Sequence, residues 1–451
     1  MSSGPRTPEA AYKFVSIPEA QQTVLHEALV LPSTLVDLQS ATGRVLAADV
    51  TAREPLPPFP SSIKDGYAVR SSDAAGDYEV AFEALAGLPP GVLEPGFVAY
   101  ISTGGPVPSG ADAVVQIENT EPLPLAPSGK RRVKIKQAAR GPGQDVRAVG
   151  SDIQEGQVVL KKGTRLNAAE IGLLATVGAS RVQVHVAPHV GILSTGDELV
   201  EPATESLASG KIRDANRSML LAAAQQAGAR VTDFGIAADT EEAVEAAFAV
   251  INAAHVDVLL TTGGVSMGDK DFIKPILERQ GKVHFGKVRM KPGKPLTFAT
   301  HSLQSGTSQA APHRMLSFGL PGNPVSAIVT FNLTVLPALR KMAGWQDPDL
   351  RRVYVRTTTP LPLDSVRPEY HRATVHWQTT GTGDGHLVAE STGGQISSRL
   401  LSMLSANALL ELPQAEGTLP AGSVVSALLI GDLQSMPVPQ GTAKLTSFEG
   451  I

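Results

Sequence analysis

The chain has 451 residues, of which 42% are hydrophobic and 18% are charged, and its net charge is −4. This balance is typical of a globular protein with buried cores, and the length predicts about three domains of roughly 150 residues each. Because the chain has no cysteine, disulfides, cysteine-ligated zinc and thiol catalysis are excluded.

Neither a nucleic acid nor a membrane is an expected partner. The densest basic run, Lys130 to Lys136, alternates with Val133 and Ile135, which predicts a strand with one solvated face rather than a basic groove. No apolar run is long enough to span a membrane, and the first ten residues lack the apolar core of a signal peptide. We therefore expect a soluble cytoplasmic protein without a membrane span.

The N-terminal part of the chain predicts helices. After a polar segment at 1–13, which we expect to be disordered, one helix is predicted from Ile17 to about Leu31 and a second over 35–46. A third is predicted over 167–177, with Asn167 as its N-cap.

Between these helices the composition changes. Prolines interrupt short β-like runs such as 113–117, which is typical of a small β-rich domain. We therefore expect an N-terminal helical domain formed by 14–48 plus 151–184, with a β-rich domain inserted at 49–150.

Residues 185–346 alternate strand and helix patterns. Strands are predicted at 190–194, 231–236, 256–260 and 315–320, and helices at 217–228, 240–254, 272–280 and 324–341. Repeated β-loop-α units predict a doubly wound, mostly parallel sheet covered by helices. In such sheets, ligands bind at the carboxyl ends of the strands.

The remainder of the chain returns to β patterns. Runs such as 353–355 and 409–412 predict a C-terminal β-barrel domain over 347–433. A stretch rich in Ser, Gln and Gly at 301–314 predicts a flexible surface loop, and the tail after Asp432 is expected to be disordered. The predicted fold class is therefore α/β and β multidomain, with the α/β domain at its centre.

Acidic residues and glycines follow the predicted strands of the α/β region. Glu198, Asp239 and Asp271 come after three of these strands, and carboxylate oxygens suit Mg²⁺ beside substrate phosphates. Gly263 and Gly264 let backbone N–H groups approach an anion closely. Each residue alone also fits a helix cap or a tight turn. Three acidic residues at one sheet edge favour a metal site.

Two further groups of residues stand out. Lys291 and Lys294 lie in a proline-rich turn, where fixed ammonium groups suit an oxyanion or a diphosphate; the alternative is a solvated hairpin with surface lysines. Asp65 lies in an Asp-Gly turn beside Tyr67, and Thr103 begins a second glycine-rich turn. Composition alone predicts only turns at these two places.

Six segments occur together in the order found in molybdenum insertases. They are 59–68, 103–114, 194–199, 263–268, 291–295 and 320–326. On these segments the chain resembles the MoeA family and the E domain of gephyrin, and most closely the E domain of the plant and algal members. The likeness covers about residues 14–433.

The resemblance implies an elongated subunit of four domains, a homodimer, and the activity of a molybdopterin molybdotransferase. Such an enzyme combines molybdate with adenylylated molybdopterin in the presence of a divalent cation and releases AMP. The positions that match catalytic residues are Asp65, Thr103, Glu198, Asp239 and Asp271, of which Asp239 and Asp271 are expected to hold the divalent cation. The substrate-binding set comprises Lys291, Lys294, Pro295, Gly263, Gly264, Ser266, Asn323, Ser326, Arg367 and Ser397.

The resemblance also implies partners. Many relatives carry a fused G domain that makes the adenylylated pterin, and no second α/β unit follows here, so we expect a separate molybdopterin adenylyltransferase, or a segment missing from this sequence, to supply the substrate. Apo-molybdoenzymes or a cofactor carrier would receive the product.

Two other functions are considered. An adenylyltransferase shares the α/β unit, but it does not require the β domains or the lysine turn. A receptor-clustering scaffold of the gephyrin type need not keep the carboxylates and lysines.

Overall fold

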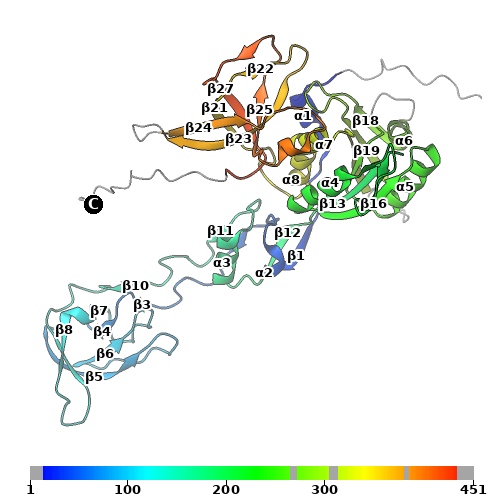
Figure 1. The fold of residues 1–451 in the computed structure, drawn as a ribbon. Coiled ribbons are helices and arrows are strands. Elements are labelled where there is room, and N and C mark those ends of the chain that lie inside the picture. The colour runs from blue at the N-terminus through cyan, green and yellow to red at the C-terminus, as the bar shows by residue number, and fades with distance from the viewer. Residues whose placement is uncertain (1–13, 265–271, 304–312, 380–384, 434–451) are drawn as a thin grey trace, which may run out of the picture. The chain divides into compact units, whose positions relative to one another are not determined.

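The computed structural model describes residues 14–264, 272–303, 313–379 and 385–433 (Figure 1). The segments 1–13 and 434–451, for which we expect disorder, lie outside the described residues. The chain divides into two compact units: residues 35–42 with 46–184, and the rest of the chain. None of the described helices is long and apolar enough to cross a membrane.

The unit that contains residues 46–184 is built around a six-stranded sheet. Its strand order is β7-β4-β6-β5-β9-β8, with β4 (Gly66–Val69), β5 (Gly76–Ala84), β6 (Phe97–Ile101), β7 (Ala113–Gln116), β8 (Thr120–Leu123) and β9 (Arg132–Ile135). In β9 the side chains of Val133 and Ile135 are buried while Lys134 is exposed, so the predicted strand with one solvated face is confirmed.

Short elements complete this unit. They are β1 (Ser33–Asp37), α2 (Leu38–Ala41), β2 (Val50–Thr51), β3 (Ser61–Ser62), η2 (Ile117–Asn119), β10 (Val146–Arg147), β11 (Val158–Leu160), α3 (Ala168–Thr176) and β12 (Arg181–His185). The predicted N-cap of α3 is confirmed, because Asn167 forms a capping box with Glu170. The helix predicted over 35–46 is wrong: residues 33–37 pair with β12 instead, and only one helical turn follows before Gly43 (φ +79°).

The larger unit contains a six-stranded sheet with the order β16-β13-β17-β20-β19-β18. Its strands are β13 (His189–Thr195), β16 (Arg230–Ala237), β17 (Val258–Thr262), β18 (Gly281–Phe285), β19 (Thr297–Leu303) and β20 (His313–Leu320). The first four strands in this order are parallel, while β19 runs antiparallel to both of its neighbours.

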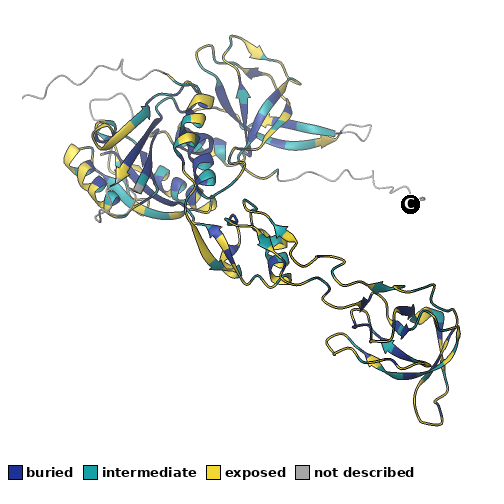
Figure 2. Ribbon diagram, turned by 180° about the vertical axis from the view of Figure 1, so that it is seen from behind, coloured by how far each residue is buried: buried dark blue, intermediate teal, exposed yellow. Residues whose placement is uncertain are grey.

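Helices cover both faces of this sheet, which confirms the doubly wound fold (Figure 1). The helices of the α/β part are α4 (Ala215–Gln226), α5 (Glu241–Ala253), α6 (Ile273–Gln280), α7 (Pro324–Thr330) and α8 (Leu336–Met342). Successive strand residues face opposite cores: Ile192 packs with α4, α7 and α8, and Leu193 packs with α5 and α6. The central strands are therefore buried on both sides (Figure 2).

Three details differ from the predicted elements. Helix α1 (Ile17–Glu27) ends one turn earlier than expected, and five residues of π-helix (Phe331–Val335) interrupt the helix predicted over 324–341. The loop predicted over 301–314 is wrong at its ends, where β19 pairs with β20 from His301–Met315 to Leu303–His313. Its centre, 304–312, lies outside the described residues.

The C-terminal strands close into a barrel with the order β21-β24-β23-β25-β27, as predicted. Its strands are β21 (Arg352–Thr357), β23 (Glu369–Thr379), β24 (Gly385–Ser391), β25 (Ala408–Leu412) and β27 (Val424–Leu429), with β22 (Leu361–Pro362), β26 (Thr418–Leu419) and η4 (Leu400–Met403) beside them. The barrel has its own aliphatic core. Tyr370, Leu409 and Leu428 also join the α/β core, so the barrel is packed against the α/β part.

Candidate active site

The centre of the candidate site is the point where the sheet changes direction. After β13 the chain adds β16 on one side and later β17 on the other, so the loops that follow β13 and β17 are neighbours. A Cβ atom on Gly263 would lie 2.2 Å from the carbonyl oxygen of Thr195, and Gly263 has φ +85°. Only glycine fits such a close approach with a left-handed backbone. The structure therefore places Gly263 at a topological switch point, where open α/β sheets bind their ligands.

A buried hydroxyl lies beneath these glycines. Thr195 is 2% exposed, and a Cβ on Gly264 would lie 2.8 Å from its Oγ1 atom. Within the described part of the chain, this hydroxyl has no hydrogen-bond partner. A buried polar atom usually has one, so Thr195 is a candidate ligand-binding residue that sequence reasoning missed.

The loop after β20 joins the same edge through Asn216 of α4. The side-chain amide of Asn216 donates 2.7 Å hydrogen bonds to Thr262 Oγ1 and to the carbonyl of Gly322. Asn323, a predicted substrate-binding residue, is the exposed N-cap residue of α7. Asn216 thus fixes the ends of β17 and β20 relative to each other, a role for which its sequence context gives no signal.

Two of the predicted carboxylates lie at this edge. The Glu198 carboxylate packs over Gly196, where a Cβ would be 2.8 Å from either of its oxygens. The backbone N–H of Asp239 donates to Asp197 Oδ1 at 3.1 Å, which joins the loops after β13 and β16. Asp239 is not a helix cap, because the N-cap of α5 is Thr240. Ser266 and Asp271, predicted on the loop after β17, lie outside the described residues.

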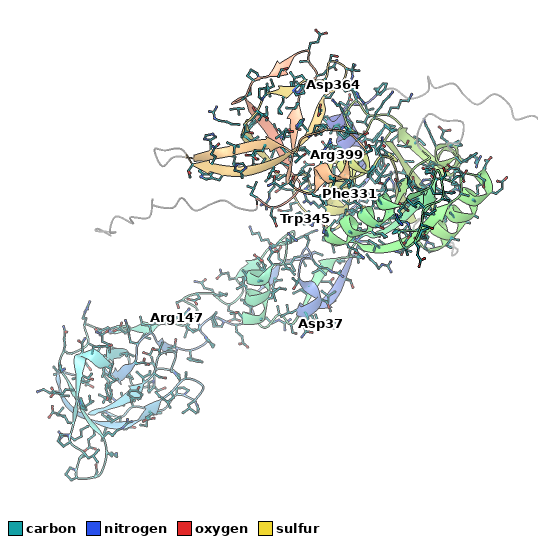
Figure 3. All side chains as sticks on the ribbon, in the orientation of Figure 1. Asp37, Arg147, Phe331, Trp345, Asp364 and Arg399 are labelled. Carbon is teal, nitrogen blue, oxygen red and sulfur yellow. The ribbon has the colours of Figure 1, made fainter. Side chains whose placement is uncertain are left out.

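The lysine turn is attached to the barrel. Lys291 Nζ lies 2.9 Å from Glu369 Oε2 and 3.4 Å from Asp364 Oδ2; Asp364 is labelled in Figure 3. Partial burial works against the charge of Lys291, but these carboxylates outweigh it and raise the pKa of its ammonium group. Burial opposes the charge of Glu369 as well, yet His371 and Lys291 together lower its pKa. The ammonium group of Lys291 therefore forms ion pairs within the protein.

Lys294 has different surroundings. Its Nζ lies 5.5 Å from the centre of the half-exposed Phe14 ring, and Lys287 Nζ lies 5.9 Å from the same ring. Pro295 follows Lys294 and is half-buried. The turn also packs on α7, because a Cβ on Gly293 (φ +109°) would lie 2.6 Å from Thr330 Cγ2.

Two predicted residues of the barrel reach this region. Arg367 Nη1 donates to the carbonyl of Met290 at 3.5 Å, directly before the lysine turn. The carbonyl of Ser397 accepts a 3.1 Å hydrogen bond from the N–H of Val325 in the first turn of α7. The next residue, Ser326, is 3% exposed. The barrel therefore contributes to the same neighbourhood as the lysine turn and α7.

Asp65 and Thr103 belong to the other unit, where they form a pair. The backbone N–H of Thr103 donates to Asp65 Oδ1 at 2.7 Å, and its hydroxyl donates to the same oxygen at 3.1 Å. Both side chains are exposed. Gly66 follows with its backbone against Val115, so the carboxylate of Asp65 is held at the end of a tightly packed strand.

Comparison with known proteins identifies the family. Three family models match consecutive parts of the chain: the MoeA N-terminal region (domain I and II) at residues 15–178, the probable molybdopterin binding domain at 191–341, and the MoeA C-terminal region (domain IV) at 354–430. A molybdopterin molybdenumtransferase from Nostoc is 34% identical over 94% of this chain and 96% of its own length. The chain belongs to the MoeA family of molybdenum insertases.

Other members of this family agree. The chain is 39% identical to gephyrin of Dictyostelium discoideum over 94% of its own length, but it spans only 64% of that relative. The crystal structure of a MoeA protein from Pyrococcus horikoshii superposes with a TM-score of 0.75 at 28% identity, covering 92% of this chain and 99% of that one. The predicted family and fold class are confirmed, and the chain is a transferase of molybdenum cofactor biosynthesis.

Within this MoeA-family chain, the roles of individual residues stay predictions. The structure brings Glu198, Asp239, Gly263, Gly264 and Asn323 to one sheet edge. The lysine turn, α7, Arg367 and Ser397 form a neighbouring group, which Gly322 connects to the edge, because a Cβ added to Gly322 would lie 3.9 Å from Gly263 Cα.

Proposed function

We propose that this chain transfers molybdenum from molybdate to adenylylated molybdopterin and releases AMP. The observation that carries this proposal is the convergence of the loops after β13, β17 and β20 on one edge. The lysine turn and Ser397 of the barrel adjoin α7, and Arg367 of the barrel adjoins the lysine turn. An anionic pterin diphosphate and a tetrahedral dianion need such neighbouring groups of backbone and cationic donors.

In this proposal, the residues of the sheet edge and the residues around the lysine turn each bind one of the two substrates. Gly263, Gly264, Ser266 and Asn323 bind the pterin nucleotide. The molybdate is held by Lys294, Pro295, Ser326, Arg367 and Ser397. Lys291 supports this group through its ion pairs rather than by contact with the anion. Holding the two reactants side by side supplies proximity, which accounts for much of the rate gained in two-substrate reactions.

A divalent cation, Mg²⁺ in this proposal, is expected beside the diphosphate. No group of three or more His, Asp or Glu side chains able to hold a metal occurs among the residues that the structure describes. Mg²⁺ needs only one or two carboxylates when phosphates complete its shell. The carboxylate oxygens of Asp239 and Asp271, which follow the predicted strands of the α/β region as Glu198 does, suit it. When bound, the ion would screen the charge of the diphosphate.

The remaining elements of the proposal rest on the family. Asp65 and Thr103 contribute from the β-rich unit, the subunit works as a homodimer, and a separate adenylyltransferase supplies the substrate. Apo-molybdoenzymes or a cofactor carrier receive the product, and a cytoplasmic location stays a prediction.

The test is to mix the purified protein with adenylylated molybdopterin, Mg²⁺ and molybdate, and to measure AMP and the reconstitution of an apo-molybdoenzyme. We expect AMP release that depends on molybdate and an active reconstituted enzyme. A second arm supplies ATP and molybdopterin, from which only an adenylyltransferase would make the adenylylated pterin. Binding of receptor peptides without molybdate-dependent AMP release would indicate a scaffold instead.

A further inference from the structure

Arg372, in the middle of β23, is completely buried. Its Nε donates to Ser402 Oγ at 3.2 Å and its Nη2 to the carbonyl of Ile396 at 3.3 Å. Nη1 has no hydrogen-bond partner among the described residues. Burial lowers the pKa of this guanidinium, although the charge of Glu369 opposes the shift. An apolar side chain of similar size would fill this position without the free-energy penalty of burying a charge, so packing alone does not explain an arginine here.

The backbone of Arg372 binds the segment that connects β24 to β25, which its side chain also contacts. Gln395 Oε1 accepts from the N–H of Arg372 at 2.9 Å, and Gln395 Nε2 donates to its carbonyl at 3.2 Å. The N–H of Thr392 donates to that carbonyl as well. The connection between β24 and β25 is therefore attached to a single residue at four positions: Thr392, Gln395, Ile396 and Ser402.

Ser397 lies inside the attached stretch, directly after Ile396. Its carbonyl accepts the N–H of Val325, so the same stretch also touches the first turn of α7 beside the buried Ser326. The place of Ser397 relative to Ser326 thus depends on where Arg372 holds the connection.

We propose that Arg372 is a positioning residue, which holds residues 392–402 so that Ser397 stays beside Ser326 and the chain keeps its affinity for a tetrahedral oxyanion. This inference rests on the proposed function, because it takes Ser397 and Ser326 to face the molybdate. It adds a residue that does not itself contact the anion.

The experiment compares Gln395→Ala, Arg372→Lys and Arg372→Met with the wild-type chain. Gln395 is only half-buried, so its truncation leaves the barrel core intact. The control is Arg352→Met, which removes a partly exposed barrel arginine whose ion-pair partner, Glu411, lies outside residues 392–402. The dissociation constant of molybdate is measured by calorimetry, and KM and kcat are measured for both substrates by AMP release.

We expect Gln395→Ala to raise the dissociation constant and the KM of molybdate roughly tenfold, because small displacements of a binding group weaken binding strongly. The KM for adenylylated molybdopterin stays unchanged. The molybdate dissociation constant of Arg372→Lys should lie between those of the wild type and Arg372→Met. An ammonium group can reach either Ser402 Oγ or the carbonyl of Ile396, but not both.

Equal molybdate affinities in the wild type, Gln395→Ala and Arg372→Met would overturn the inference and leave the proposed function standing. A parallel rise in the KM of both substrates would also overturn it, because that indicates general loosening. A wild-type chain that neither binds molybdate nor releases AMP would overturn both.

Discussion

Lys291 Nζ lies 2.9 Å from Glu369 Oε2, and this ion pair attaches the lysine turn to strand β23 of the barrel. Glu369 is 4% exposed, and it also contacts His371 Nδ1 at 3.1 Å. Removing one partner of a buried pair leaves the other charge without compensation. The pair therefore matters for the stability of the unit and for the position of Lys294.

The first prediction concerns Glu369→Gln. We expect it to lower the free energy of unfolding by roughly 2 kcal/mol at neutral pH. The loss is smaller than for a fully buried pair, because Lys291 still pairs with Asp364 and is partly exposed to solvent. The matched control is Glu411→Gln, which breaks a more exposed pair with Arg352 and should cost about 1 kcal/mol or less. Urea unfolding measures both; equal losses would contradict the role assigned to Glu369.

The same ion pair predicts a dependence of stability on pH. The pKa of Glu369 is lowered from its ordinary value of 4.5, so its contribution is complete above that pH and is lost as the pH falls through the lowered pKa. The pKa of Lys291 is raised from 10.5, so its contribution is lost as the pH rises through the raised pKa. The melting temperature should fall less steeply in acid for Glu369→Gln than for the wild type.

The third prediction concerns Gly263. Gly263→Ala places a Cβ 2.2 Å from a backbone oxygen, whereas Gly228 has the same φ of +85° with nothing within 4 Å. Gly228→Ala therefore measures the cost of the backbone conformation alone, roughly 1 kcal/mol. We expect Gly263→Ala to cost at least about 2 kcal/mol more and to abolish AMP release. Similar unfolding curves for the two variants would show that the loop can move away.

The fourth prediction concerns Asn216. Asn216→Ala removes both hydrogen bonds that join the ends of β17 and β20, so we expect kcat/KM to fall roughly tenfold, with a stability loss of about 1–2 kcal/mol. Gln226→Ala, at an exposed position of the same helix, is the control. An Asn216→Ala enzyme with wild-type kcat/KM would remove this residue from the site.

Some of this arrangement is predictable from the sequence, because it follows from local patterns. The apolar run at 256–260 followed by Gly263 and Gly264 predicts a strand end with a tight loop, and the rule for parallel sheets gives its location. Asn167, a residue favoured at N-caps, predicts the start of α3 in the same way, and the structure adds its capping box with Glu170. These signals lie within a few residues of the feature that they predict.

The parts that sequence reasoning missed depend on contacts between distant segments. Nothing near Lys291 in the sequence indicates that its ammonium pairs with Glu369 of the barrel. The strand at 33–37 carries a helix-like pattern but pairs with β12, and tertiary pairing overrides weak local preference. Asn216 likewise acts through two loops that are remote in sequence.

The most direct test of the whole proposal is AMP release at increasing molybdate for the wild type, Lys294→Met and Lys287→Met. Both lysines lie over the ring of Phe14, so the two variants lose comparable contacts with it, but only Lys294 is assigned to the anion. We predict that AMP release by the wild type saturates with molybdate, that Lys294→Met raises the KM for molybdate at least roughly tenfold, and that Lys287→Met changes it by less than about twofold. AMP release that is independent of molybdate, or identical curves for the two variants, would contradict the proposal.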